Sequence, residues 1–123
     1  MPHILRTQHV LAVDDYPANV AYFTNQLGFT LNNEIGGWAF LSLDDFHVML
    51  GDCQGEMLAE ETHSHSWFAY VNCTGIDDYY NAMANRGAII REKLMNKPWG
   101  MREFAIVTPD GHRIVFGERL ADA

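Results

Sequence analysis

The chain has 123 residues, 48% of them hydrophobic, which suits one compact domain with a core of its own. No apolar run approaches the roughly 18 residues that a membrane span needs, and the first residues, MPHILRTQHVLAV, lack a signal-peptide pattern, so we expect a cytoplasmic protein. Sixteen acidic against eight basic residues give a net charge of −8, which argues against a nucleic-acid partner, and two cysteines, Cys53 and Cys73, are too few for a disulfide scaffold.

The first half of the chain predicts a strand, a helix and then further strands. HVLAV is an apolar strand, and in the following segment Val20, Phe23 and Leu27 recur at helical spacing before Gly28, a typical helix stop. Short strands follow, the first of them the least clearly marked. The predicted ranges are 9–13 for the first strand, 18–29 for the helix, and 29–34, 37–43 and 46–50 for the later strands.

A polar linker at about 53–65 separates this half from a second half with the same order. WFAYVN predicts a strand, and in the next segment Tyr79 and Met83 have helical spacing before Gly87. Asp77 is the candidate N-cap of this helix. The predicted ranges are 67–72 for the strand, 77–88 for the helix, and 88–95, 102–108 and 112–117 for the later strands.

The last strands of the two halves align without a gap. LDDFHVMLGD and TPDGHRIVFGE each contain a turn, a short apolar strand, a glycine and an acid. The sequence therefore predicts an α+β fold of two βαβββ repeats, in which two half-covered sheets enclose or bury their open faces. The aligned pairs include Asp44/Asp110, His47/Arg113, Val48/Ile114, Met49/Val115, Leu50/Phe116, Gly51/Gly117 and Asp52/Glu118.

This pattern resembles the vicinal oxygen chelate superfamily, which includes glyoxalase I, extradiol dioxygenases and the bleomycin resistance proteins. HVLAVDDYPANVAYFTNQLGF is similar to the first strand and helix of that family, and FAIVTPDGHRIVFGE to its closing hairpin. The resemblance covers nearly the whole chain and implies one domain over 1–123, with repeat halves at about 4–52 and 66–118. The fold hosts several reactions, so it does not by itself imply one chemistry.

Metal-dependent members of the superfamily carry ligands on the first and last strands of each half. By this resemblance the four positions are His9, its second-half counterpart Trp67, Met49 and Val115, of which His9 alone is a ligand type. A catalytic divalent metal needs at least three protein ligands. We therefore expect no metal and no cofactor.

The segment KPWGMREF, residues 97–104, places Trp99 between a proline and a glycine, and together with SHSWFAYV it resembles the bleomycin resistance proteins. In that family similar tryptophan segments line a ligand groove, and one protein, which binds the antibiotic without altering it, is a dimer with two grooves between its subunits. The resemblance implies a homodimer. Arg102 and Glu103, next to the tryptophan, are predicted to form a surface ion pair. The predicted ligand-binding residues are Trp38, Phe40, Trp67, Tyr70, Trp99 and Gly100.

Aromatic faces and a negative protein field suit a bulky aromatic, cationic small molecule. By resemblance this is a bleomycin-type antibiotic, bound and sequestered without catalysis, and we expect a binding protein rather than an enzyme. Core packing or a subunit contact remains the other reading of the tryptophans. The alternative functions are a superfamily enzyme acting on an unknown small metabolite, with His9 as base or residual ligand, and a binding module for a different hydrophobic effector.

Overall fold

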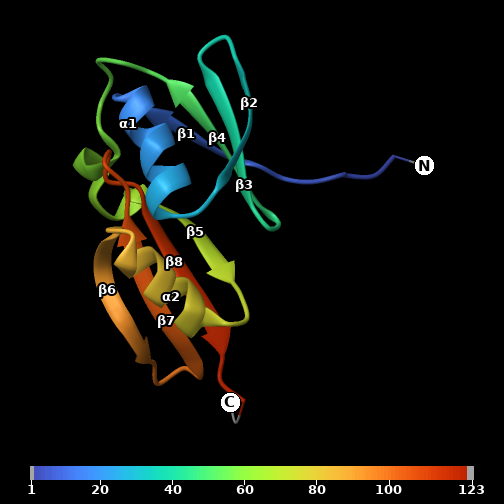
Figure 1. Ribbon diagram of the computed structural model, residues 1–123, viewed down its shortest axis with the longest axis vertical. Coiled ribbons are helices and arrows are strands. Elements are labelled where there is room, and N and C mark those ends of the chain that lie inside the picture. The colour runs from blue at the N-terminus through green and yellow to red at the C-terminus, as the bar shows by residue number, and fades with distance from the viewer. Residues whose placement is uncertain (1, 122–123) are drawn as a thin grey trace.

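The computed structural model describes residues 2–121 and contains two four-stranded sheets with helices packed against them (Figure 1). The strand orders are β1-β4-β3-β2 and β5-β8-β7-β6, so each half repeats the same topology. In both sheets the first strand pairs in parallel with the last, and the other pairs are antiparallel. The strands are β1 His9–Val13, β2 Thr30–Ile35, β3 Trp38–Leu43, β4 Phe46–Asp52, β5 Trp67–Asn72, β6 Ile89–Asn96, β7 Met101–Val107 and β8 Arg113–Arg119.

The predicted order of strand, helix and three strands is confirmed in both halves. The first helix begins earlier than predicted: α1, Tyr16–Ala21, is capped by the Asp15 side chain, which accepts a hydrogen bond from the backbone nitrogen of Ala18. It continues as a π-helical turn, η1, Tyr22–Gln26. A short 3₁₀ segment, η2, Ala59–Ser66, occupies part of the predicted linker. No helix in residues 2–121 is long and apolar enough to cross a membrane.

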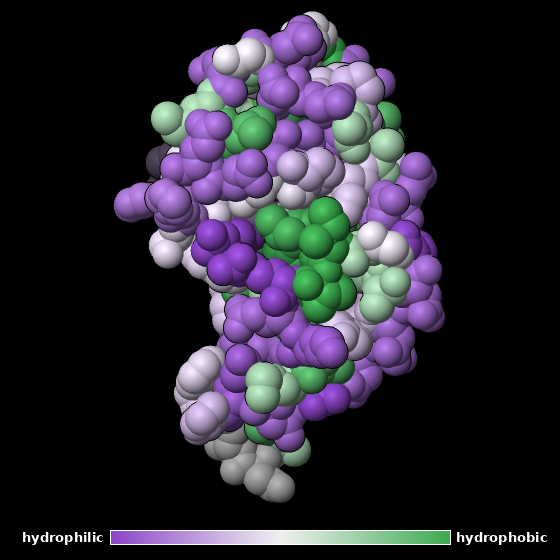
Figure 2. Space-filling model, turned by 90° about the vertical axis from the view of Figure 1, so that its left-hand side faces the viewer, coloured by the Kyte–Doolittle hydropathy of each residue, from purple (hydrophilic) through white to green (hydrophobic). Residues whose placement is uncertain are grey.

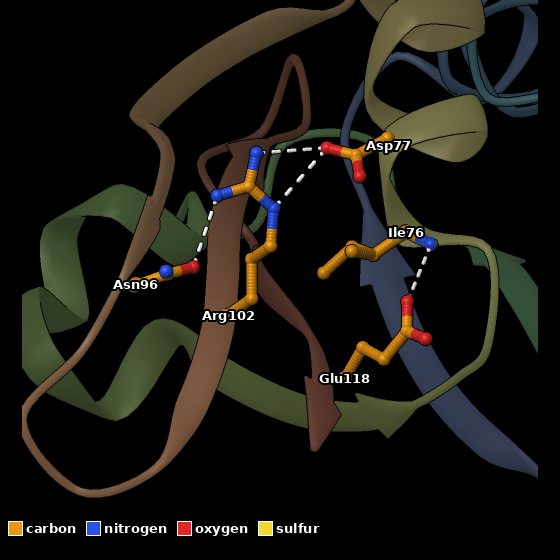
Figure 3. A network of polar contacts seen from close by, with 5 residues as sticks. All are labelled: Ile76, Asp77, Asn96, Arg102 and Glu118. Carbon is orange, nitrogen blue, oxygen red and sulfur yellow. Dashed lines mark hydrogen bonds and ion pairs between the residues drawn. The ribbon is translucent and has the colours of Figure 1, made fainter. Parts of the chain in front are cut away.

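The second helix, α2, Ile76–Asn85, is held at its N-terminus by residues of the second sheet (Figure 3). Glu118 of β8 accepts a hydrogen bond of 2.9 Å from the backbone nitrogen of Ile76. Asp77, predicted as the cap, instead accepts hydrogen bonds from Arg102 of β7, which also donates to Asn96. The prediction of an Asp77 cap is therefore wrong, because a carboxylate from the neighbouring strand already fills that position.

One hydrophobic core joins the two sheets through their helix-covered faces. Phe46 of β4 contacts Phe29 of its own half, with ring centroids 5.2 Å apart, and Phe68 and Phe116 of the other half, both at 6.5 Å. The hydroxyl of Tyr22 donates to the carbonyl of Val107, which ties η1 to the second sheet. The two halves therefore share one core, to which both helix-covered faces contribute.

The opposite face of each sheet has no helix over it. Strand side chains alternate between faces, so Val48 and Leu50 are buried in the core while His47 and Met49 of the same strand lie on the other side. In β8, Ile114 and Phe116 are buried in the same way. We call these uncovered faces the first and the second outer face. The first carries Val10, Trp38, Phe40, His47 and Met49, and the second carries Trp67, Tyr70, Glu103, Arg113 and Val115.

Phe46→Ala should destabilise the protein far more than Phe40→Ala, although both residues lie in the β3–β4 hairpin. Phe46 is 8% exposed and its loss opens a cavity between the two halves, which costs about 3–5 kcal/mol. Phe40 lies half-buried on the first outer face, and its loss should cost about 1 kcal/mol. Urea unfolding at one fixed protein concentration measures both values. Equal losses of unfolding free energy in the two variants would show that Phe46 does not connect the two halves of the core.

Candidate functional site

The second outer face carries an aromatic cluster made of Trp67, Tyr70 and Trp99. All three were predicted to bind ligand, and they lie on this face or at its rim. Tyr70 is 46% and Trp99 64% exposed, which is unusual for rings of this size on a sheet with a buried opposite face. The cluster therefore offers aromatic surface that the chain itself does not cover.

A tight turn between β6 and β7 presents Trp99. The backbone nitrogen of Gly100 donates to the carbonyl of Lys97, which closes a four-residue turn with Pro98 at its second position. Gly100 has φ of 85°, a left-handed conformation that favours glycine. The Lys97 ammonium lies 5.7 Å from the centre of the Trp99 ring. Gly100 thus acts through the backbone shape of the turn, which sets where the indole ring lies.

Glu103 organises the cluster, although the sequence predicts a surface ion pair between Glu103 and Arg102. That pairing is wrong: neighbours on a strand point to opposite faces, so Arg102 reaches Asp77 on the α2 side and Glu103 lies on the outer face. The Glu103 side chain is only 8% exposed. Its Oε2 atom accepts hydrogen bonds from the Tyr70 hydroxyl at 2.5 Å and from the Trp99 indole nitrogen at 2.9 Å. One buried carboxylate therefore fixes two of the three rings.

The hydrogen bond between Tyr70 and Glu103 changes the ionisation of the phenol. Partial burial of the ring and the adjacent Glu103 carboxylate both disfavour the phenolate, so they raise the pKa of Tyr70 well above its ordinary value. Tyr79 is affected similarly: its hydrogen bond to Asp44, with partial burial, raises its pKa to about 12. Tyr70 is therefore a neutral hydrogen-bond donor throughout the physiological pH range.

Trp67 lies beside two arginines. The guanidinium carbon of Arg113 is 5.2 Å and that of Arg91 is 5.5 Å from the centre of the indole ring, within cation–π range. A ligand that stacks on this ring shares it with two positive charges. Two cations thus flank Trp67, whereas Tyr70 and Trp99 share the Glu103 carboxylate and Trp99 also lies near the Lys97 ammonium.

Two glycines explain why rings can lie flat on the outer faces. A β-carbon on Gly117 would overlap the Tyr70 hydroxyl, and one on Gly51 would come within 2.8 Å of the Trp38 ring. Neither glycine has a positive φ, so space rather than backbone conformation requires it. Gly51 and Gly117 are an aligned pair in the two repeats, and each half uses its glycine to seat an aromatic ring.

The predicted ligand-binding residues do not form one site in a single chain. Trp38, 37% exposed, and Phe40 lie on the first outer face, whereas Trp67 and Tyr70 lie on the second. Both faces point away from the shared core. A cavity of about 670 Å³ lies where the two halves meet, between the β3–β4 turn and β5, and Tyr70 is the only one of the six predicted residues in its lining.

The structure corrects the predicted metal-ligand positions. His9 pairs with Val48, and the residue that pairs with the equivalent Ile114 is Ala69, so the counterpart of His9 is Ala69 rather than Trp67. The strand pairing is irregular between Trp67 and Ala69, so alignment of the two repeats does not show that Ala69 is the counterpart of His9. The His9 ring lies edge-on to Phe46 and Phe68, with centroids 5.3 and 5.8 Å apart, on the side of the core.

The residues on the outer faces do not suit a divalent metal. The strand partners of Met49 and Val115 are Val10 and Tyr70, none of which is a metal ligand of the usual type. Within residues 2–121, no three His, Cys, Asp or Glu side chains come together in a group that could hold an ion.

Comparison with known proteins places these features in a family. The sequence model of the Glyoxalase/Bleomycin resistance protein/Dioxygenase superfamily matches residues 1–116. The chain is 24% identical to a bleomycin resistance protein of Geobacillus stearothermophilus, with 95% of this chain and 98% of the relative aligned. Its fold is similar to that of TioX from Micromonospora sp. ML1, with a TM-score of 0.72, 23% identity, and 94% and 98% of the two chains covered. It is also similar to TnmS3, an antibiotic binding protein from Streptomyces sp. CB03234, with a TM-score of 0.73, 18% identity, and 97% and 98% covered.

Glu103→Gln should lower the pKa of Tyr70, because the substitution removes the carboxylate charge but keeps a side chain of the same shape. The pKa of Tyr70 should still lie above that of a free tyrosine, since partial burial of the ring persists. The stability that this raised pKa contributes is fully present below about pH 10 and is lost as the pH rises through the folded-state pKa. Phenolate absorbance against pH, with Tyr70→Phe to assign the signal, measures the shift.

Glu92→Gln is the matched control, because Glu92 is an exposed acid on β6 that pairs with Lys97 at 3.7 Å. This substitution should leave the Tyr70 titration where it is. An unchanged Tyr70 titration in Glu103→Gln would mean that the hydrogen bond between the two side chains does not form.

Proposed function

Because the chain belongs to the Glyoxalase/Bleomycin resistance protein/Dioxygenase superfamily, we propose that it binds a bulky aromatic, cationic small molecule of the antibiotic type and sequesters it without chemical change. The observation that carries this proposal is the exposed aromatic cluster held by the Glu103 carboxylate. The names of relatives support it, since they include bleomycin resistance proteins and an antibiotic binding protein.

The cluster has the physical properties that such a ligand needs. Offset stacking of a flat heteroaromatic group on an indole adds about 0.5–1.5 kcal/mol beyond the burial of area. Both donors of the cluster reach Oε2 of Glu103, and no donor among residues 2–121 bonds to Oε1. That oxygen can accept a bond from a ligand cation. The net charge of −8 adds a long-range attraction for cations.

We infer that the full binding site forms between two copies of the chain. In a two-fold dimer, the first outer face of one copy can cover the second outer face of the other, and the symmetry repeats this contact. Two equivalent grooves result, each lined by Trp38 and Phe40 from one chain and by Trp67, Tyr70 and Trp99 from its partner. In this arrangement the six predicted residues act together, which they do not do in one chain.

Apolar surface beyond the aromatic cluster supports association. Residues 2–8 lead away from both sheets, and Ile4 and Leu5 in this segment are 83% and 85% exposed (Figure 1). Figure 2 shows a continuous apolar area near the middle of one side of the molecule, with hydrophilic residues around it. Exposed apolar surface of this kind is typical of a protein that binds a partner.

The protein should be a homodimer of twice the 14.0 kDa chain mass at micromolar concentration. Association covers aromatic side chains on both outer faces, so replacing Trp38 and Phe40 with serine should weaken it. Light scattering coupled to size exclusion measures the mass, with Tyr16→Phe as a substitution outside both faces. If the wild-type protein has the mass of a single chain, the inferred groove between two copies does not form.

Metal-free bleomycin should bind with one molecule per chain, and Trp99→Ala should weaken binding about thirtyfold, corresponding to about 2 kcal/mol for the loss of a central aromatic anchor. His9→Ala should change the affinity little, because the His9 ring packs against the core. Higher salt should weaken binding, since screening shortens the reach of the negative field to about 10 Å at 0.1 M. Isothermal titration of variants with verified folding and dimerisation measures these effects. Normal bleomycin binding by Trp99→Ala, or turnover of a metabolite that His9→Ala abolishes, would overturn the sequestration proposal.

A further inference from the structure

The surroundings of Trp67 are positively charged, although the protein as a whole is negative. The chain has twice as many acidic as basic residues, yet two of its eight basic side chains, Arg91 and Arg113, lie against one indole ring. Neither arginine forms an ion pair with any side chain of residues 2–121. In a protein with this excess of carboxylates, two neighbouring guanidinium groups without an acidic partner are unexpected.

The contact with Trp67 holds these guanidinium groups without using their hydrogen-bonding capacity. A cation–π contact uses no N–H hydrogen bond, so the guanidinium donors remain available to a ligand. A planar fork of donors in a fixed position is the arrangement that binds a carboxylate or another oxyanion with two parallel hydrogen bonds. The two arginines therefore offer N–H donors and positive charge that no acidic side chain of residues 2–121 pairs with.

The three side chains meet above the second outer face. Trp67 and Arg91 belong to β5 and β6, the two edge strands of this sheet, and two strands lie between them. They come together because both side chains are long and extend across the same face, where Arg113 of β8 joins them. Ala105 lies on this face of β7 and is only 1% exposed, so the face is covered at this level. Arg91 is exposed and Arg113 half-buried, which leaves the guanidinium groups open to solvent or ligand.

The arginine pair lies along the sheet from the Glu103 carboxylate. Glu103 pairs with Gly117 of β8, four residues after Arg113 on the same strand, which corresponds to about 13 Å. Tyr70 and Val115 lie between these two levels on the same face. The second outer face thus has the arginine pair at one end and, toward the other, the Glu103 carboxylate with the Lys97 ammonium beside Trp99; Tyr70 and Val115 lie between them.

We propose that Arg91 and Arg113, positioned by Trp67, bind a carboxylate group of the ligand. This inference rests on the proposed function, because it names the ligand class of the same face: an aromatic molecule that carries a carboxylate group. Arg91 and Arg113 determine specificity for the anionic end. Trp67 acts as a positioning residue for them, as Glu103 does for Trp99.

Two probes that differ only in charge test this proposal, 2-naphthoate and the neutral 2-naphthamide, titrated by quenching of tryptophan fluorescence. The wild-type protein should bind 2-naphthoate at least about tenfold more tightly than 2-naphthamide, since charge-assisted hydrogen bonds to guanidinium are the strong ones. Arg91→Gln and Arg113→Gln should each remove most of this preference. Arg86→Gln, which removes the same charge from the end of α2, should retain it.

Arg91 is exposed, so its substitution should leave the fold intact, and near-UV circular dichroism checks this for every variant. Equal affinity for the two probes, absence of binding by both, or an equal loss in Arg86→Gln would overturn the carboxylate site. Bleomycin titration of the same samples tests the proposed function separately. Bleomycin binding without a preference for naphthoate removes the carboxylate site alone, and a preference for naphthoate without bleomycin binding supports the site while removing the sequestration proposal.

Discussion

The packing of both helix-covered sheet faces into one core is the constraint on which the rest of the structure depends. Phe46 contacts rings of both halves, and Tyr22 and Asn19 add hydrogen bonds from the first half to Val107 and Asp110 of the second. Once this core is formed, the other face of each sheet has no cover from its own chain. The aromatic side chains on those faces gain little from folding alone, which favours a role in binding a partner chain and a ligand.

The chemistry of the second outer face follows from a few buried or confined groups. Glu103 has two donors on one oxygen, so it orders Tyr70 and Trp99 and retains a negative charge near them. The stack of Trp67 with two arginines places positive charge at the other end of the same surface. The arginine pair can orient a ligand that carries one carboxylate as well as bind it, because the reversed ligand would bring that carboxylate to Glu103.

The sequence predicts the fold better than it predicts the site, for physical reasons. Strand alternation and glycine stop signals depend on local sequence, and β1 and β5 have the predicted bounds. The same alternation distinguishes Arg102 from Glu103: once Phe104 is assigned to the core, Arg102 lies on the core side of β7 and Glu103 on its outer face. The sequence does not predict the pairing irregularity after Trp67, which depends on how β5 pairs with the distant strand β8. Nor does it predict the contact of Trp67 with Arg91, because β5 and β6 are not neighbours in the sheet. The aligned Gly51 and Gly117 were visible as a repeat, but the rings that require them lie elsewhere in the chain.

Subunit mixing tests most directly the central claim that each ligand groove combines the first outer face of one chain with the second outer face of another. Trp38→Ala and Trp99→Ala impair the two faces separately, so each variant alone should bind metal-free bleomycin weakly. After the two variants exchange subunits in equal amounts, half of the dimers are mixed and each has one intact groove, so roughly a quarter of the wild-type high-affinity sites should return. Isothermal titration counts these sites. If mixing restores none of them, although mixed dimers are present, the groove does not form between chains in this way.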